Sequence, residues 1–257
     1  MRTLVIYVFH QLNDRVEQFL KTIFKDEDID FLVVCNSKSI HLSLPDYVKV
    51  LYRENIGYDF GGWSDGILTN DLYKQYDNFI FVNSSVIGPF LPSYYKGKWT
   101  DIYIDGLKNC GLKNDGLKNG GLKNDVKLFG STINCCFSVY GPKMIDPVNE
   151  SHVQSYIFSM DRETLDYLIE NEIFTQKRYI TDFVELVIKR EFRMSRLIIE
   201  KGWNIGCLMD NYQGIDFTFK TINKQIEYLG DVMLPHNYNK LWTLKELVFI
   251  KGNRIHF

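Results

Sequence analysis

The chain has 257 residues, of which 45% are hydrophobic, 15% aromatic and 24% charged, and its formal net charge is −2. This length is enough for one large domain with an ample apolar core. The near-balanced charge gives no electrostatic reason to expect nucleic acid as a partner. No apolar run reaches the roughly 18–20 residues that span a bilayer, so we expect no transmembrane segment. Five cysteines without C-x-x-C spacing favour neither a disulfide framework nor a zinc site, and they indicate a cytoplasmic location.

The first hundred residues alternate between predicted strands and predicted helices. Asn13, followed by Glu17, predicts a capping box at the start of a first helix. A glycine-rich turn over residues 55–62 leads into a second predicted helix over residues 63–75. Apolar runs predict strands at residues 4–9, 31–35 and 79–82, and a further strand is predicted at residues 48–52. Strands separated by helices indicate an α/β fold with a mostly parallel sheet, in which ligands bind beyond the carboxyl ends of the strands.

The middle of the chain carries a five-residue repeat, in which Gly-Leu-Lys-Asn and one variable residue occur four times over residues 106–125. Such units are too short for a solenoid, whose repeats run to about 20 residues or more. The repeat therefore predicts an expanded surface loop, and a recognition role for its lysines is the alternative. Just before it, alternation predicts a strand on which Asp101 and Asp105 share one solvated face.

The second half returns to strands and helices. Residues 127–130 and 151–160 are predicted strands, and a helix is predicted over residues 161–171. Asp182 predicts the cap of a long helix that ends at Gly202, because glycine is common just past helix C-termini. The inward-facing side chains of this helix are predicted to be Phe183, Leu186, Val187, Met194, Leu197 and Ile198.

The segment Arg53–Trp63 combines polar side chains with glycines at positions 57, 61 and 62. It has neither the Gly-Lys-Ser/Thr of a Walker loop nor the G-x-G-x-x-G of a dinucleotide fingerprint. Arginine, asparagine and aspartate around a glycine turn can hold a ribose and a diphosphate. The alternative is an ordinary strand-to-helix turn in which Asp59 caps the helix, and the residues alone leave both interpretations open.

A second polar segment, Asn83–Phe90, directly follows a predicted strand. Metal-dependent sugar transferases commonly carry an Asp-x-Asp here, because carboxylate oxygens suit Mg²⁺ or Mn²⁺ on a diphosphate. Asn83, Ser84 and Ser85 supply neutral oxygens in its place but no negative charge.

Further candidates lie toward the end of the chain. Glu191 could act as a general base on a hydroxyl, or pair with its neighbours on the helix surface. His236 is the histidine most suited to bind a metal, although a lone histidine more commonly makes structural hydrogen bonds. Lys251 and Arg254 could neutralise a diphosphate, or be ordinary surface charges.

Several blocks of the chain together resemble the rhamnan-synthesis-F-like glycosyltransferases. One block alone would be a weak signal, but these blocks occur in family-like order across most of the chain. They are Arg53–Trp63, Asn83–Phe90, Val126–Cys135, His152–Tyr156, Glu191–Arg196, Gly202–Cys207 and Glu246–Arg254.

The resemblance implies a GT-A-like fold and a role in polysaccharide biosynthesis. The implied reaction transfers a hexosyl or deoxyhexosyl group, with inversion, from a nucleotide diphosphate donor to a hydroxyl of a glycan or glycoprotein. One domain over residues 1–257 would hold a nucleotide-sugar-binding half at about 1–100 and an acceptor-binding half at about 126–257. The repeat loop at 106–125 would lie between them.

The resemblance also implies roles for particular residues. Glu191 precedes Gly202 as the catalytic acid precedes a similar glycine in inverting family-2-like transferases, so it becomes the general base. The implied donor contacts are Phe9, His10 and Asn36 at the nucleotide base, Arg53, Asn55 and Asp59 at the ribose or diphosphate, Asn83 and Ser85 at the Asp-x-Asp position, and Lys251 and Arg254 at the leaving diphosphate. The implied acceptor contacts are Trp63, His152 and Gln154. Ser84 stands where relatives often have the aspartate, so the need for Mn²⁺ or Mg²⁺ is open.

A non-catalytic nucleotide- or glycan-binding module on the same fold is the alternative function. The missing Asp-x-Asp is the feature that favours it. Donor binding without turnover on any acceptor would distinguish this module from a transferase.

Overall fold

A seven-stranded sheet forms the centre of the protein. The computed structural model describes residues 1–108, 126–135, 150–219, 226 and 231–254. The strand order is β10-β6-β9-β4-β1-β2-β3. Strand β9 runs antiparallel to its neighbours β4 and β6, and the other pairings of the sheet are parallel. The predicted α/β class with a mostly parallel sheet is confirmed.

The strands of this sheet are β1 Thr3–Phe9, β2 Ile29–Cys35, β3 Val48–Tyr52, β4 Asn78–Asn83, β6 Val126–Gly130, β9 Ile157–Asp161 and β10 Asn204–Cys207. Two short antiparallel ladders pair β5 Val86–Ile87 with β11 Ile250–Lys251, and β7 Ile133–Asn134 with β8 His152–Val153. The first ladder joins the C-terminal segment to the segment that follows β4.

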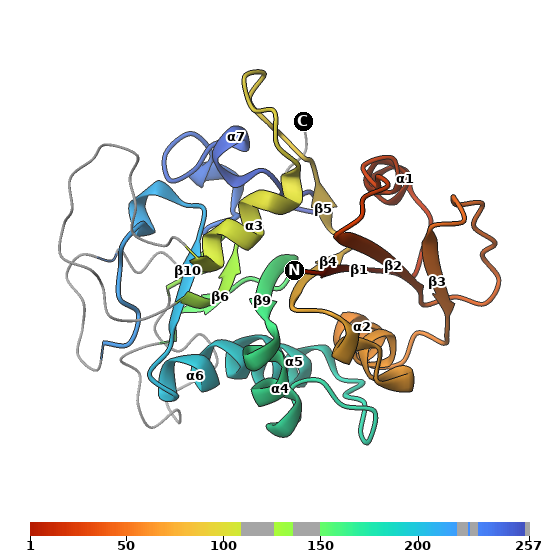
Figure 1. Cartoon of the computed structure of the whole chain (residues 1–257). Helices are drawn as coiled ribbons and strands as arrows, with labels where there is room; N and C mark the ends of the chain where they lie inside the picture. Colours follow the sequence, from red (N-terminus) through yellow and green to blue (C-terminus); the bar gives the residue numbers. More distant parts are fainter. Residues whose placement is uncertain (109–125, 136–149, 220–225, 227–230, 255–257) are drawn as a thin grey trace.

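Helices cover both faces of the sheet, α1, α3 and α7 on one face and α2, α4, α5 and α6 on the other (Figure 1). They are α1 Asp14–Leu20, α2 Tyr58–Leu68, α3 Trp99–Lys108, α4 Arg162–Glu170, α5 Phe183–Leu186, α6 Arg193–Glu200 and α7 Leu244–Leu247. Between α5 and α6 the backbone is π-helical over Val187–Phe192. Short 3₁₀ segments are Thr69–Gln75, Asp210–Tyr212 and Pro235–Asn237.

The predicted helix starts at Asn13 and Asp182 are confirmed, but the predicted capping box with Glu17 is wrong, because the third residue of the first helix is Val16. The side chain of Asn13 accepts a hydrogen bond from the backbone N–H of Val16, and the side chain of Asp182 accepts one from Glu185. Gly202 follows the last helical turn at a φ of +82°, which a residue with a Cβ rarely adopts. These caps depend only on neighbours in the sequence, so the sequence alone locates them.

The predicted glycine-rich turn over residues 55–62 is partly wrong, because α2 begins at Tyr58. Gly57, with a φ of +77°, and Tyr58, with a φ of +52°, make the turn in the left-handed region. Gly62 lies inside the helix, where an added Cβ would stand 2.7 Å from a methyl group of Val8 on β1. Gly62 therefore lets the helix lie close to the sheet, whereas a Cβ added at Gly61 would stand 2.2 Å from the Ile56 carbonyl in the turn before the helix.

The predicted strand over residues 101–105 is wrong, because these residues form part of α3. The buried residues Trp99, Thr100 and Tyr103 recur at the spacing of one helix face. The Asp101 carboxylate accepts a hydrogen bond from the backbone N–H of Lys98, near the start of the helix. Residues 106–108 of the repeat form the last turn of α3 rather than a loop. The rest of the repeat, residues 109–125, lies outside the described residues.

The predicted strand over residues 151–160 is two strands, β8 and β9. β8 pairs only with β7, in a separate two-stranded ladder that the Gln154 N–H continues by donating to Thr132 O, whereas β9 belongs to the central sheet. Between the two strands the Ser155 N–H donates to the carboxylate of Glu191. One predicted inward-facing side chain of the long helix, Phe183, is 61% exposed and instead packs edge-on against Tyr58.

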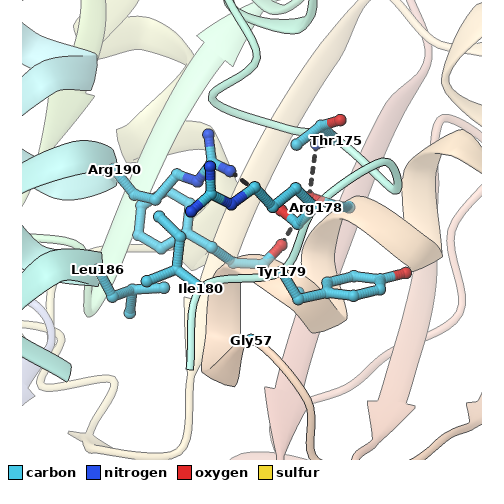
Figure 2. A pocket seen from close by; sticks show the side chains of 10 residues that line it. Gly57, Thr175, Arg178, Tyr179, Ile180, Leu186 and Arg190 are labelled. Atoms are coloured by element: carbon cyan, nitrogen blue, oxygen red, sulfur yellow. Dashed lines mark hydrogen bonds between the residues drawn. The ribbon is translucent and has the colours of Figure 1, made fainter. Parts of the chain in front are cut away.

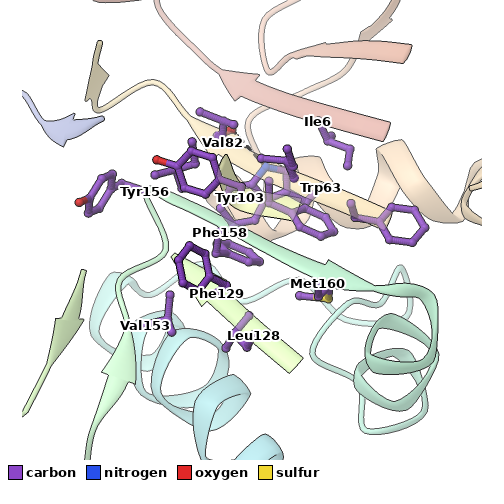
Figure 3. Packing of buried hydrophobic residues seen from close by; sticks show 14 of the residues in the cluster. Ile6, Trp63, Val82, Tyr103, Leu128, Phe129, Val153, Tyr156, Phe158 and Met160 are labelled. Atoms are coloured by element: carbon purple, nitrogen blue, oxygen red, sulfur yellow. Dashed lines mark hydrogen bonds between the residues drawn. The ribbon is translucent and has the colours of Figure 1, made fainter. Parts of the chain in front are cut away.

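The core lies on both faces of the central strands and is rich in aromatic rings (Figure 3). Trp63, from α2, packs edge-on against Phe81 of β4 and Phe158 of β9, while Tyr103 of α3 lies on the opposite face. This packing holds α2 against β4 and β9. Within the described part of the chain, none of the helices combines the length and the hydropathy that crossing a bilayer requires.

Candidate functional site

The carboxyl ends of six strands meet at one edge of the sheet. β1, β2, β3 and β4 are mutually parallel, and β6 and β10 share their direction because β9 runs against both β4 and β6. Asn36 and Arg53 follow the ends of β2 and β3, and Asn83 ends β4. The predicted polar segments therefore lie at the edge where α/β sheets bind ligands.

Asn83 connects two carboxylate-bearing parts of this edge. Its side-chain oxygen accepts hydrogen bonds from the Ser85 N–H (3.0 Å) and the Ser85 hydroxyl (2.5 Å). Its amide nitrogen therefore faces the other way, donating to Asp59 Oδ2 at 2.9 Å and approaching the Ser155 carbonyl at 3.5 Å. We call Asp59, Asn83, Ser155, Glu191 and His152 the carboxylate cluster.

Asp59 is an unusual carboxylate. Burial raises its pKa from 3.8 to about 6, against the opposing effects of the Asn83 hydrogen bond and the positive charge of Lys251. The negative charge of Glu191 raises it further. Lys251 forms no ion pair with a carboxylate in the described part of the chain. Two carboxylates and an ammonium group thus lie close enough to influence one another's charge.

Glu191 reaches the cluster from the π-helical segment, an irregularity often found at functional sites. Its Oε2 accepts hydrogen bonds from the Ser155 N–H at 3.3 Å and from the Ser155 hydroxyl. Its Oε1 lies 3.7 Å from His152 Nε2. One carboxylate oxygen is therefore fixed by Ser155, while the other faces the imidazole.

The protonation of His152 follows from its partner. Its Nδ1 lies 2.9 Å from the Glu150 carbonyl, which can only accept, so Nδ1 carries the hydrogen. Burial lowers the His152 pKa despite the nearby Glu191 charge, so the ring is neutral and its Nε2 is an acceptor. Glu191 Oε1 and His152 Nε2 are then two acceptors facing each other, an arrangement suited to receive one proton from a third group.

Arg53 holds residues of the site in place through hydrogen bonds within the protein. It is 9% exposed and donates to Asp65 Oδ2 at 2.5 Å, to Asn36 Oδ1 at 2.9 Å and to the Ile56 carbonyl at 2.7 Å. All three of its nitrogens thus bind protein acceptors. Arg53 holds Asn36 and the turn before α2 in place, while Asn36 in turn donates to the Asn55 side chain at 3.2 Å.

The residues of the predicted acceptor half form a second chain of hydrogen bonds. Gln154 accepts from the Thr132 hydroxyl at 2.8 Å and donates to Asp231 Oδ1 at 3.0 Å. The other oxygen of Asp231 lies 3.6 Å from a guanidinium nitrogen of Arg254. Arg254 is therefore partly neutralised by Asp231, whereas Lys251 forms no ion pair with any residue that the structure describes.

Two predicted site residues are buried, and a third is exposed in a short 3₁₀ turn. Trp63 is 0% exposed and donates from its ring to the Val82 carbonyl at 3.3 Å, so in this structure it offers no surface to an acceptor. Phe9 is 1% exposed and packs in the core, so its ring cannot stack on a nucleotide base, and only the exposed His10 beside it is accessible. His236 is exposed in the 3₁₀ turn Pro235–Asn237.

Sequence reasoning missed several residues of the site. Ser155 lies within the block His152–Tyr156, so its neighbours gave a signal, but nothing local shows that it binds Glu191. Asp65 and Tyr179 complete the support of Arg53, with the Tyr179 hydroxyl donating to Asp65 Oδ1 at 2.6 Å. Such partners are far apart in the sequence, and no motif marks them.

A small cavity lies beside Tyr179, one of the residues that hold Arg53 (Figure 2). It is bounded by Gly57 at the start of α2 and by Tyr179, Ile180 and Arg190. Its volume of about 10 Å³ admits roughly one water molecule, so it is a packing gap rather than a substrate site.

The described residues contain no group of three or more His, Cys, Asp or Glu side chains arranged to hold a metal ion. Asp59 offers one carboxylate at the ligand-binding edge, and the Ser85 hydroxyl lies beside it, with both bound to Asn83. Mg²⁺ is commonly held by one or two carboxylates together with substrate phosphates. The residues present therefore fit a cation brought with a diphosphate better than a permanently bound one.

The comparisons with known proteins identify the family. A protein from STIV has a structure similar over 74% of this chain and 78% of its own, with 12% identity and a TM-score of 0.33. A glycosyltransferase involved in the glycosylation of the major capsid of PBCV-1 is similar over 99% and 98%, with 11% identity and a TM-score of 0.40. No curated protein sequence matches the chain significantly. Residues 31–250 match the family described as rhamnan synthesis protein F, so the chain belongs to that family.

Proposed function

We propose that the protein is a glycosyltransferase that moves a sugar from a nucleotide diphosphate donor to a hydroxyl of a glycan or glycoconjugate. Membership of the rhamnan synthesis protein F family supports a role in polysaccharide synthesis with a hexosyl or deoxyhexosyl donor. The observation that carries the mechanism is the geometry of Glu191. One of its oxygens is fixed by Ser155, and the other lies 3.7 Å from the neutral His152 ring at the ligand-binding edge of the sheet.

Lys251 is the residue best suited to the donor diphosphate. It has no carboxylate partner among the described residues, and it lies near Asp59 and His152, whose pKa values it affects. Arg254 is the second candidate, with its charge shared with Asp231. Asn55 and His10, both exposed, remain candidates for the ribose and the nucleotide base.

The charge of Asp59 bears on its proposed place at the donor diphosphate. An ionised carboxylate repels a diphosphate, so Asp59 binds one either through a cation or in its protonated form. Mn²⁺ or Mg²⁺ would supply positive charge to the leaving diphosphate. Asp59 and Ser85 are the residues that would hold such a cation, because they offer a carboxylate and a hydroxyl oxygen beside Asn83.

In the proposed reaction Glu191 Oε1 removes the proton from an acceptor hydroxyl. The hydroxyl oxygen then bonds to the anomeric carbon from the face opposite the diphosphate, and the bond from that carbon to the diphosphate oxygen breaks. The departing oxygen keeps the electron pair, and Lys251 stabilises its charge. The product sugar has inverted configuration, and Glu191 ends the step protonated beside the His152 acceptor nitrogen.

Replacing Glu191 with glutamine tests this function. Glutamine still accepts from Ser155 but cannot take a proton, so Glu191→Gln should abolish transfer and leave donor binding intact. Glu185→Gln is the matched control, because Glu185 lies on the same helical segment and pairs with Lys189 on the surface. Retained turnover in Glu191→Gln would reject Glu191 as the base. Donor binding by the wild type without turnover on any acceptor would favour a non-catalytic binding module.

A further inference from the structure

A second, larger cavity lies apart from the carboxylate cluster. Its volume is about 390 Å³, within the range of roughly 300–1,000 Å³ that is usual for small-molecule sites. It opens between the segment that follows β5, the turn that follows β10 and helix α7. Its lining residues are Pro92, Ser93, Tyr94, Leu208, Asp210, Lys245 and Glu246. We call it the Tyr94 cavity.

Backbone hydrogen bonds hold the walls of the Tyr94 cavity together. Glu246 Oε1 accepts from the N–H of Asp210 at 2.7 Å, and its Oε2 accepts from the N–H of Thr243 at 2.9 Å. One side chain thus joins the turn after β10 to the start of α7. The third wall is tied to the chain just beyond α7, because the Phe90 N–H donates to the Val248 carbonyl at 2.7 Å. The cavity is therefore built into the fold before any ligand binds.

The side chains facing the Tyr94 cavity offer three kinds of contact. Tyr94 is 81% exposed, so its ring presents a flat apolar surface to a ligand. Asp210 is exposed and supplies an acceptor, and Lys245 is exposed and supplies a donor. Neither forms an ion pair with another described residue. An aromatic face beside separate donor and acceptor groups matches a pyranose ring, which has an apolar C–H face and an edge of hydroxyl groups.

The charge of the lining argues against a nucleotide at this place. Asp210 and Glu246 carry two negative charges against the single positive charge of Lys245. Burial and the Asp210 charge raise the Glu246 pKa, as expected for a carboxylate at the inner wall of a cavity. A diphosphate would meet net negative charge, whereas a neutral sugar would not.

We propose that the Tyr94 cavity binds one or two neutral sugar units of a glycan, with the pyranose ring stacked on Tyr94 and its hydroxyl groups bound to Asp210 and Lys245. The choice of a glycan as ligand rests on the proposed function. The site shares no residue with the carboxylate cluster. It would hold the glycan chain at a distance from the reacting hydroxyl and so favour long acceptors over short ones.

Ligand-observed NMR with methyl pyranosides of rhamnose, glucose and galactose, and with the corresponding disaccharides, tests the proposal on the full chain. Tyr94→Ala should weaken binding of at least one sugar by about tenfold or more. Because Tyr94 is 81% exposed, this change should leave the thermal unfolding temperature unaltered. Tyr47→Ala is the matched control, since Tyr47 is also an exposed tyrosine but lies before β3. It should bind sugar as the wild type does.

Three results would overturn the proposal: no sugar bound by the wild type, equal binding in Tyr94→Ala, or equal loss in Tyr47→Ala. Stabilisation by nucleoside diphosphates, measured on the same variants, separates this proposal from the proposed function. If Tyr94→Ala keeps that stabilisation and also binds sugar normally, the cavity assignment alone fails. If no nucleotide stabilises the wild type while sugar binding depends on Tyr94, the transferase assignment alone is in error.

Discussion

The buried carboxylate of Asp59 lowers the stability of the folded protein at neutral pH. Its folded-state pKa is about 6 against 3.8, a difference that corresponds to about 3 kcal/mol at most. Between these values the folded state holds a proton that the unfolded state has lost. Stability therefore falls as the pH rises from 3.8 to about 6, and the loss stays constant above that range. Asp59→Asn removes the charge and keeps an oxygen to accept from Asn83.

Urea unfolding across this pH range measures the effect. At neutral pH Asp59→Asn should be more stable than the wild type by up to about 3 kcal/mol, and the difference should shrink toward zero as the pH approaches about 4. Asp65→Asn is the matched control on the same helix. It leaves the buried Arg53 guanidinium unpaired and should cost about 3–5 kcal/mol. A less stable Asp59→Asn, or a difference that does not vary with pH, would refute the reasoning.

Other predictions concern single side chains. Trp63→Ala should cost about 3–5 kcal/mol in urea unfolding, because the ring is fully buried; an unchanged unfolding free energy with weaker acceptor binding would instead favour the acceptor role. Lys251→Ala should weaken the binding of a nucleoside diphosphate, measured by calorimetry, and leave that of the matching nucleoside unchanged; equal loss of both would contradict a diphosphate contact. Burial lowers the His152 pKa, so below about pH 6.5 the unfolded state binds a proton at this residue more readily than the folded state does. The wild-type protein therefore loses stability as the pH falls through this range. His152→Asn should remove this pH dependence, because asparagine does not titrate. If the difference in unfolding free energy between the variant and the wild type stays constant between about pH 7 and 5, this explanation is wrong.

The sequence predicted the parts of the fold that depend on near neighbours. Strands β1, β2 and β4 are built around continuous apolar runs, and the caps at Asn13 and Asp182 require only a side chain three residues from its partner. Gly62 shows the limit of such reasoning. A glycine in a polar segment suggests a turn, but here its missing side chain lets α2 approach Val8 on β1, a contact between distant parts of the chain.

In the candidate site too, local patterns revealed single residues but not their distant partners. The sequence drew attention to Asn83, Asp59 and Glu191 because each follows a strand or lies on a helix within a recognisable block. It could not predict that Ser155 binds Glu191, since Ser155 lies in the connection between β8 and β9 and its partner is 36 residues further along the chain. Nor could it predict that Arg53 is committed to Asp65 and Asn36, which removes its charge from the surface offered to a ligand.

Thermal unfolding in the presence of UDP, GDP, TDP or CDP, each with and without Mn²⁺, tests the central claim of a donor site most directly. A ligand at about a hundred times its Kd stabilises the folded protein by about 2.7 kcal/mol, which raises the unfolding temperature measurably. We expect one nucleotide to stabilise the wild type and to stabilise Lys251→Ala less. Stabilisation that requires Mn²⁺ would indicate a cation at Asp59. If none of the four nucleotides stabilises the protein under either condition, the donor site proposed at the carboxylate cluster is contradicted.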